Sequence, residues 1–267
     1  MSGDTGTVRI DCFPLDHYQR PGVYRRRVRI ETRPGQARAE LEDDPHRYGV
    51  TLQHHDRRVS AVEGRALRTP WSLCGEAVRM LDRLLGMPLS PDPQQVYRHS
   101  DGRAQCTHLV DLAGLALAHA ARGIARRQYD IDVPCLDPAS ERQANLRVDG
   151  QLFLRWTLQQ TRIVAPQAHA GQDLGSMMPW AKAQITDPDE FEAVIVLRRA
   201  VFTAGNRFYQ MDRMSRASDT GHVVGACYVF QHGVADRALR RIGSTLDFSA
   251  GPDALLSDLE QAPAAPG

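Results

Sequence analysis

Four short runs of alternating apolar and polar residues lie near the beginning of the chain. They span residues 23–31, 37–42, 48–54 and 59–67, and turn-forming pairs such as Pro34-Gly35 and Asp44-Pro45 separate them. A period of two is typical of strands that bury one face, and turns this short join antiparallel neighbours. The pattern predicts an antiparallel β-meander over residues 23–67.

Helical spacing of apolar residues follows the meander. It predicts helices over residues 72–85, 107–127 and 187–205, and a weaker helix over 234–242. Residues 151–160 alternate again, which predicts a strand, and we expect this strand to hydrogen-bond to the early meander. Residues 130–149 are polar and hold two prolines, so we expect a surface loop there.

These elements predict an α+β fold in which the antiparallel meander packs against several helices. A chain of 267 residues can bury one large core. We expect a single domain over residues 1–249. The segment 250–267 is rich in alanine, proline and acidic residues, so we expect a disordered tail.

The charge balance bears on partners. Thirty-three basic residues face 32 acidic ones, so no strong field attracts nucleic acid or an anionic membrane. No apolar stretch approaches the roughly 20 residues of a membrane span, and residues 1–7 carry no apolar leader. We therefore expect a cytoplasmic protein with a small-molecule substrate, without nucleic-acid or membrane partners. The oligomeric state stays open.

Cysteine and histidine residues supply the candidate chemistry. Of the five cysteines, Cys12, Cys135 and Cys227 are scattered, whereas Cys74 and Cys106 both lie near predicted helix starts, where a thiolate is favoured. A thiolate beside an imidazole acts as a nucleophile or binds a soft metal. The alternative is that at least one of the two cysteines is an inert buried residue.

The catalytic candidates are distributed over the meander and the helix that follows it. His54 shares a strand face with apolar residues, and Asp111 lies one turn beyond His108, where it could orient the imidazole. The segment Asp43-Asp44-Pro45-His46 is either a general base beside an imidazole or simply a turn, and we favour the turn. The set comprises His46, His54, Cys74, Cys106, His108 and Asp111, with Tyr48, Trp71 and Arg68 as substrate-binding residues.

Arg25-Arg26-Arg27 is an arginine run inside a predicted strand. Its members alternate between the two faces, so they do not form one patch. We interpret the run as a solvent-exposed face.

The motif Pro70-Trp71 with Cys74, followed by Cys106-Thr107-His108-Leu109, resembles a bacterial family of domains of unknown function (DUF2889-like), and the likeness extends along most of the chain. Members of that family occur among catabolic genes for aromatic or lipid-like compounds. The resemblance implies a small-molecule catabolic enzyme, of lyase or hydrolase type, that uses the cysteine and histidine groups for acid–base chemistry.

The layout of residues 48–121 also resembles iron–sulfur scaffold proteins, with a cysteine near the start of each of two helices. This second resemblance implies a non-catalytic metal-binding or cluster-carrier module, with Cys74, Cys106 and His108 as ligands. The chain has Gln105 where those scaffolds carry a histidine, and it lacks their acidic residue after the first cysteine.

Overall fold

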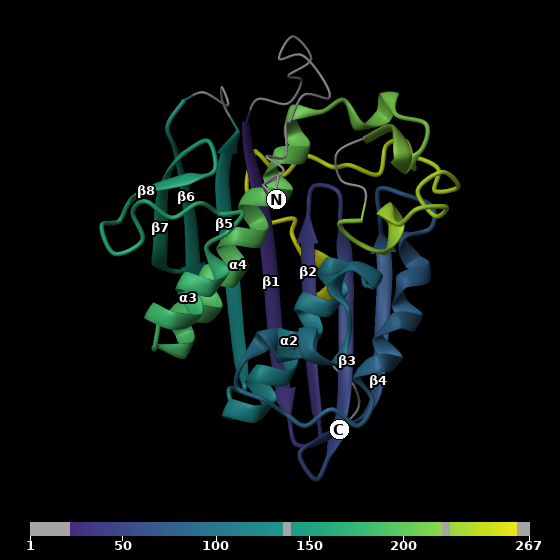
Figure 1. Cartoon of the computed structure of the whole chain (residues 1–267), viewed down its shortest axis with the longest axis vertical. Coiled ribbons are helices and arrows are strands. Elements are labelled where there is room, and N and C mark those ends of the chain that lie inside the picture. Colours follow the sequence, from purple (N-terminus) through teal and green to yellow (C-terminus); the bar gives the residue numbers. More distant parts are fainter. Residues whose placement is uncertain (1–21, 136–139, 221–224, 261–267) are drawn as a thin grey trace, which may run out of the picture.

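The computed structural model describes residues 22–135, 140–220 and 225–260. Its eight strands form one antiparallel sheet in the order β4-β3-β2-β1-β5-β6-β7-β8 (Figure 1). The strands are β1 (Gly22–Arg33), β2 (Gln36–Asp43), β3 (Arg47–His55), β4 (Arg58–Arg68), β5 (Arg126–Cys135), β6 (Arg142–Val148), β7 (Gln151–Gln159) and β8 (Arg162–Ala165). The α+β class and the four-stranded meander are confirmed.

Four α-helices and several 3₁₀ helices are present among the described residues. The α-helices are α1 (Val96–His99), α2 (Thr107–Arg122), α3 (Met178–Gln184) and α4 (Pro188–Ala204). The 3₁₀ helices are η2 (Cys74–Leu84), η3 (Pro93–Gln95), η4 (Gly102–Ala104), η5 (Gly205–Phe208), η6 (Met211–Arg213), η7 (Ala217–Thr220), η8 (Tyr228–Phe230) and η9 (Ser257–Leu259). None of the helices in these ranges is long and apolar enough to cross a membrane.

Helices α2 and α4 lie side by side on one face of the sheet (Figure 1). Helix α2 packs on β1, β2 and β3, and α4 packs mainly on β5 and β6. Between Tyr24 and Ile30, the even-numbered residues of β1 face these helices and are buried, while the odd-numbered ones are half-buried on the opposite face. One apolar core therefore fills the space between the sheet and the two helices.

Close packing at Gly114 brings η3 against α2. A β-carbon at this position would lie 2.2 Å from the carbonyl oxygen of Pro93, so only glycine fits. Glycine in a helix interior costs about 1 kcal/mol relative to alanine. This close approach places Pro93 and Gln94 at the wall of a small cavity that residues of α2 and α4 also line.

The opposite face of the sheet is polar and densely ion-paired. Arg25 pairs with Asp132, Arg27 with Asp130, and Arg47 with Glu40. These pairs correct the prediction of a surface loop over residues 130–149, because the acidic residues belong to β5 and neutralise the arginines of β1. The polar composition reflects cross-strand pairing and not a loop.

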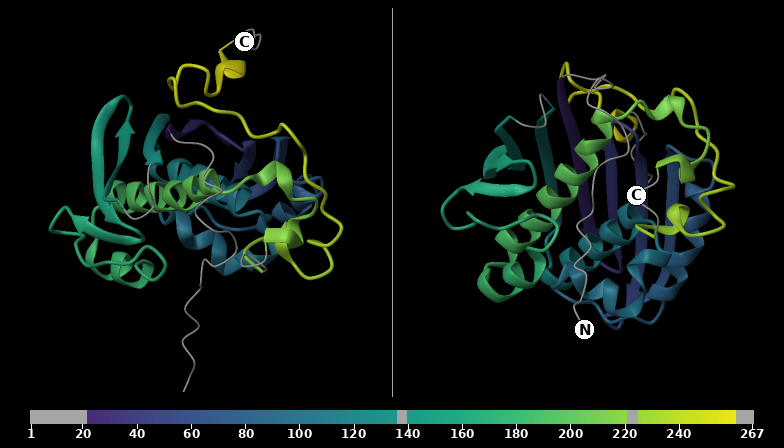
Figure 2. Two further views of the ribbon diagram at one scale, coloured as in Figure 1. Left: turned by 90° about the horizontal axis from the view of Figure 1, so that it is seen from above. Right: turned by 45° about the horizontal axis from the view of Figure 1, so that its top comes forward.

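The C-terminal segment crosses this polar face, on the side of the sheet away from α2 and α4 (Figure 2). Leu255 and Leu256 are buried, and the backbone N–H of Leu256 donates to Glu42 at 2.7 Å. Asp258 forms an ion pair with Arg47. Residues 250–260 are thus packed, which differs from the disordered tail that composition suggested, and residues 261–267 lie outside the described range.

Three further expectations need correction. Strand β7 joins the same sheet but hydrogen-bonds to β6 and β8, and not to the meander. Helix α2 ends at Arg122 because Gly123 adopts a left-handed conformation with φ of 71°, so Arg126 and Arg127 begin β5. Residues 234–242 form turns and not a helix. The helix predicted over 187–205 matches α4.

Candidate active site

The β2–β3 hairpin fixes Asp43 and His46 side by side. The backbone N–H of Asp43 donates to the carbonyl of His46 at 2.9 Å, which closes a loop of two residues, Asp44 and Pro45. The Asp43 Oδ1 atom accepts from the backbone N–H of His46 at 2.9 Å and lies 3.0 Å from its ring Nδ1. The segment is therefore a turn and, at the same time, a carboxylate–imidazole pair.

Arg68 holds this hairpin in place from β4. Its guanidinium donates to the carbonyls of Asp43 and His46, at 2.8 and 3.2 Å, and to the carboxylate of Glu42 at 2.8 Å. Its remaining terminal nitrogen donates to the carbonyl of Asp44. These bonds leave Arg68 in a structural position, which corrects its prediction as a substrate-binding residue.

Arg26 is buried beside Asp43. The β1–β2 register sets the two residues directly opposite each other, and the Arg26 side chain is 2% exposed. One terminal nitrogen donates to Asp43 Oδ2 at 2.6 Å and to Thr203 of α4 at 2.8 Å, and the Nε donates to the Tyr24 hydroxyl at 2.9 Å. The solvent-exposed interpretation of the arginine run is wrong for Arg26, because β1 turns this position toward the helices.

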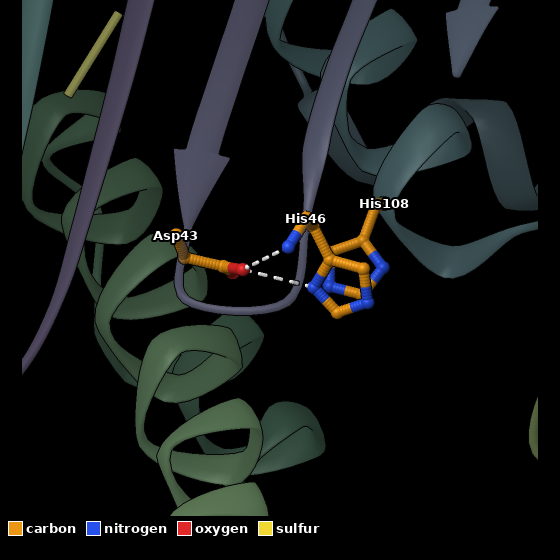
Figure 3. A group of neighbouring side chains, drawn as sticks. All are labelled: Asp43, His46 and His108. Carbon is orange, nitrogen blue, oxygen red and sulfur yellow. Dashed lines mark hydrogen bonds and ion pairs between the residues drawn. The ribbon is translucent and has the colours of Figure 1, made fainter. Parts of the chain in front are cut away.

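His108 reaches the same cluster from the first turn of α2. Its ring lies 3.9 Å from the His46 ring between centroids, at 39°, and stacks on Tyr48 at 5.6 Å and 12°. Its Nε2 is 3.3 Å from the terminal nitrogen of Arg26. Figure 3 shows the two imidazoles overlapping on one side of Asp43, with His108 entering from its helix.

These contacts favour one tautomer for each ring in its neutral form. A guanidinium only donates, so His108 Nε2, which lies 3.3 Å from Arg26, is favoured with its lone pair toward Arg26 and the ring proton on Nδ1. The two hydrogens of that Arg26 nitrogen are donated at shorter distance to Asp43 and Thr203. An ionised Asp43 only accepts, so His46 carries its proton on Nδ1 and leaves Nε2 with a lone pair. The pair consequently presents one acceptor nitrogen, on His46, and one donor N–H, on His108.

The electrostatics reinforce this arrangement. Burial alone would raise the pKa of Asp43, but the neighbouring His46 and Arg26 outweigh burial and hold that pKa well below its usual range. Burial, followed by the electrostatic influence of the neighbouring His46 and Arg26, lowers the pKa of His108 well below its ordinary value. Asp43 is therefore ionised and His108 neutral near pH 7. Burial is the main cause of the lowered pKa of His108.

A small cavity of about 20 Å³ adjoins His108. Polar groups of Arg26, Asp111 and Arg199 line it, together with apolar residues of β1, α2 and α4. Asp111 accepts from Arg199 Nε at 2.6 Å and from the Tyr97 hydroxyl. The prediction that Asp111 orients His108 is thus corrected, because its carboxylate instead holds Arg199 at the cavity.

The cysteines lie near Tyr48. Cys74 and Cys106 are 7% and 6% exposed, and both thiols are close enough to Tyr48 to influence its pKa. Burial raises the pKa of each thiol. They are therefore protonated near pH 7, which argues against a role as nucleophiles.

Two other candidates lie apart from the histidine pair. His54 is at the far end of β3, eight residues from His46, which is about 26 Å along an extended strand. Trp71 is buried in a second apolar cluster with Cys74 and Met214, with the Arg240 guanidinium 5.7 Å from its ring centre. The structure does not bring either residue to the site.

The metal-ligand geometry differs from the sequence-based set. Within residues 22–135, 140–220 and 225–260, the one group whose ligand atoms lie within 4.8 Å of one another is Asp43, His46 and His108. Cys74 and Cys106 do not join His108 in such a group. The four cysteines in the described ranges, Cys74, Cys106, Cys135 and Cys227, are all free thiols, and Cys12 lies outside those ranges.

Sequence reasoning missed Arg26, Arg199 and Thr203 as members of this neighbourhood. Only the arginine run gave a local signal, and its alternation places Arg26 on the opposite face from Arg25 and Arg27. The roles of Arg199 and Thr203 depend on where α4 crosses the sheet. No local pattern in the sequence encodes that crossing.

Comparison with known proteins agrees with the motif-based resemblance. No curated protein matches the chain. The family match covers fewer residues than the resemblance suggested, but it includes Asp43, His46, Cys74, Cys106 and His108. Residues 5–122 match the family described as "Protein of unknown function (DUF2889)".

Proposed function

We propose that this chain is a small-molecule enzyme in which His46 transfers protons and His108 donates a hydrogen bond, without a metal ion. The observation that carries the proposal is the complementary pair of ring nitrogens, fixed by Asp43 on one side and Arg26 on the other. His46 Nε2 is the general base, and the Nδ1–H of His108 is the hydrogen-bond donor. A positioned acid–base group of this kind typically contributes about 10²- to 10⁴-fold in rate.

Asp43 has the role of positioning His46 and stabilising its protonated form. Its carboxylate is 0% exposed and accepts from both the backbone and the ring of His46, so the ring has one orientation. When His46 takes a proton, the adjacent carboxylate balances the new positive charge. Because the carboxylate stabilises the protonated ring, His46 can take up a proton and later release it.

The neutral state of His108 suits a donor that polarises a substrate oxygen. Arg26 occupies its Nε2, so the ring offers only its Nδ1–H to a ligand. A neutral imidazole that stays neutral through the reaction can donate a hydrogen bond to a carbonyl or alkoxide oxygen as negative charge develops. The guanidiniums of Arg26 and Arg199 add positive potential at the same place.

The cavity beside His108 favours a reaction in which water takes part. Its volume of about 20 Å³ is the space that one water molecule needs, and Arg26, His108, Asp111 and Arg199 supply polar partners. His46 does not line this cavity, so the proposal requires a water molecule or substrate group at His46 Nε2 that loses its proton there, and the same proton would later pass to the leaving group. Both hydrolases and lyases that add or remove water fit this chemistry.

Metal binding at Asp43, His46 and His108 is the competing interpretation. Two imidazoles and one carboxylate are a recognised ligand set for divalent metals. However, Arg26 already donates to both Asp43 Oδ2 and His108 Nε2, so a metal ion would have to displace a buried guanidinium. Repulsion between these two cations disfavours the metal interpretation.

The experiment is a turnover screen with matched variants. Wild-type protein, His46→Gln, His108→Gln and the control His55→Gln are incubated with a panel of esters, thioesters and hydroxy acids, and products are identified by mass spectrometry. His55 is 83% exposed in its side chain and far from the site. We expect turnover that falls about 10²- to 10⁴-fold in both site variants and is unchanged in the control.

Two further measurements separate the competing interpretations. Nitrogen NMR of the histidine rings should show His46 and His108 both as neutral Nδ1–H tautomers near pH 8. Metal analysis of the purified protein should show no stoichiometric metal. A stoichiometric metal that His46→Gln removes, or a His108 proton on Nε2, would contradict the proposal.

A further inference from the structure

A second and larger cavity lies beside the histidine site. It encloses about 330 Å³ and is lined by Tyr97 of α1, residues of η4, Thr107 at the start of α2, and Ile195, Arg198 and Arg199 of α4. Gln94, Ile195 and Arg199 also line the small cavity at His108. The two cavities therefore share a wall, and 330 Å³ is within the range of small-molecule sites.

The charges around the larger cavity are mainly positive. Three arginines, Arg103, Arg198 and Arg199, face one carboxylate, Asp101. Arg199 is neutralised by Asp111, and Asp101 accepts the backbone N–H of Arg103 at 3.0 Å. Among the described residues, no carboxylate pairs with the side chain of Arg103 or Arg198.

Arg198 is held by neutral partners only. Its Nε donates to the carbonyl of Leu174 at 2.6 Å, and its guanidinium lies 4.9 Å from the ring centre of Phe202. Burial and the adjacent Arg199 lower the pKa of Arg198, and the nearby Asp111 and Asp173 offset this effect only in part. Its two terminal nitrogens are available to a ligand. Their planar arrangement matches the geometry of carboxylate and phosphate groups.

The opposite face of the sheet gives an internal reference for this arginine. There Arg25, Arg27 and Arg47, all of them largely buried, each pair with an aspartate or glutamate at 2.6 Å or less. Each of these three arginines therefore has a carboxylate partner. Arg198, at the wall of a cavity, has no ion pair with a carboxylate among the described residues.

We propose that the larger cavity binds the anionic group of the substrate, a carboxylate or a phosphate, on Arg198 and Arg103. The inference rests on the proposed function, because it places the reacting part of the same substrate toward His108. Ile195 and Met178 provide apolar walls, so the substrate also carries an apolar body. The ligand class is an apolar carboxylic acid or a phosphate monoester.

Calorimetric titration with defined probes tests this inference without knowledge of the natural substrate. Benzoate and phenyl phosphate are the anionic probes, benzamide is the neutral probe, and acetate and inorganic phosphate test the anionic group alone. We expect both anionic aromatic probes to bind wild-type protein and benzamide to bind more weakly. The stronger of the two anions identifies the group that the site prefers.

The variants are Arg198→Gln and Arg103→Gln, with Arg33→Gln as the matched control. Arg33 is exposed at the end of β1 and far from both cavities. Loss of charged hydrogen bonds from Arg198 should weaken binding of the anionic probes about 10- to 100-fold, and Arg103→Gln should weaken it less. Arg198→Lys keeps the positive charge but loses the planar guanidinium. Its affinity for the anionic probes should lie between those of wild type and Arg198→Gln.

The outcomes for the two proposals are separable. His46→Gln should bind the anionic probes like wild type although it is expected to lose turnover. Retained probe affinity in a folded Arg198→Gln, equal binding of benzamide, or no binding of any anionic probe at millimolar concentration would overturn the anion site. Arg198-dependent binding together with undiminished turnover in His46→Gln would overturn the proposed function and leave the anion site standing.

Discussion

Two clusters adjoin Tyr48 and differ in the partners of their reactive groups. In one, His46 is buried and His108 half-buried beside Asp43 and Arg26, which orient the rings and supply opposite charges. In the other, Cys74 and Cys106 are buried among apolar residues, and the pKa of each thiol is raised. Burial with charged partners prepares a group for proton transfer, whereas burial without them makes it inert.

The largest expected effect contrasts the two clusters directly. His46→Gln should lower kcat/KM about 10²- to 10⁴-fold on any substrate found in the screen, because it removes the base. Cys74→Ala and Cys106→Ala should change kcat/KM by less than about threefold, because protonated thiols take no part in proton transfer. Steady-state kinetics measures both effects. If a cysteine variant lost as much activity as His46→Gln, the cysteines would belong to the same active site as the histidines.

The second prediction concerns the stability of the histidine cluster. Arg26→Met removes the guanidinium partner of the buried Asp43 carboxylate, and breaking a buried ion pair typically costs about 3–5 kcal/mol. Urea unfolding should show a loss of this size. Asp43→Asn in the Arg26→Met background should recover part of it, since no buried charge remains. A loss below about 1 kcal/mol, the range of surface ion pairs, would contradict the buried-pair geometry.

The third prediction concerns thiol reactivity. Burial raises the pKa of Cys227 to about 12, and Cys74 and Cys106 are shifted upward as well. Iodoacetamide labelling of these three cysteines near pH 8 should therefore be more than about tenfold slower in folded than in urea-unfolded protein, because the thiolate is the reactive form. Peptide mass spectrometry resolves the sites. Rapid labelling of Cys106 in the folded protein would restore it as a candidate nucleophile.

The smallest expected effect is a pH dependence of stability from His108. Its pKa is lower in the folded than in the unfolded protein, so the unfolded state binds the proton first as the pH falls. The stabilisation is complete above the unfolded pKa of about 6.5 and is lost progressively below it. Between about pH 7.5 and 5.5, wild type should lose about 1 kcal/mol more than His108→Gln.

Urea unfolding of both proteins at the two pH values gives this difference directly. The comparison with His108→Gln cancels the contributions of the other titrating groups, Asp44 included, whose pKa burial raises to about 6. Equal pH profiles for the two proteins would mean that the pKa of His108 is not lowered. The donor role that we assign to His108 would then lose its electrostatic basis.

Local sequence signals accounted for the meander and for parts of the histidine site. The alternation of residues 23–67 and the short turns between the runs gave β1 to β4 within two residues at each end. The Asp43-Asp44-Pro45-His46 segment carried enough information for a turn, and the structure adds that the same geometry pairs Asp43 with His46. His108 was recognisable from its position at a helix start.

The sequence pattern did not predict strands β5 and β6, because the polar residues of β5 form ion pairs with a distant strand. Asp130 and Asp132 are in β5 to neutralise Arg27 and Arg25 of β1, more than 100 residues away. A polar stretch that faces an ion-paired sheet cannot be told from a loop by hydropathy. The grouping of cysteines with histidines failed for a similar reason, since closeness in sequence did not bring the two thiols into one ligand group with His108.

The sequence by itself determined the α+β class, the antiparallel meander, the helix that begins at Asp187 and the resemblance of the motif-bearing part to an uncharacterised family. These features depend on periodicity, turn chemistry and contiguous motifs, which are local. Only the tertiary structure decided that Arg26 faces inward, that α4 brings Thr203, Arg198 and Arg199 to the site, and that the cysteines are excluded. Those outcomes depend on how distant elements pack, because charges from separate elements compensate one another only where packing brings them together.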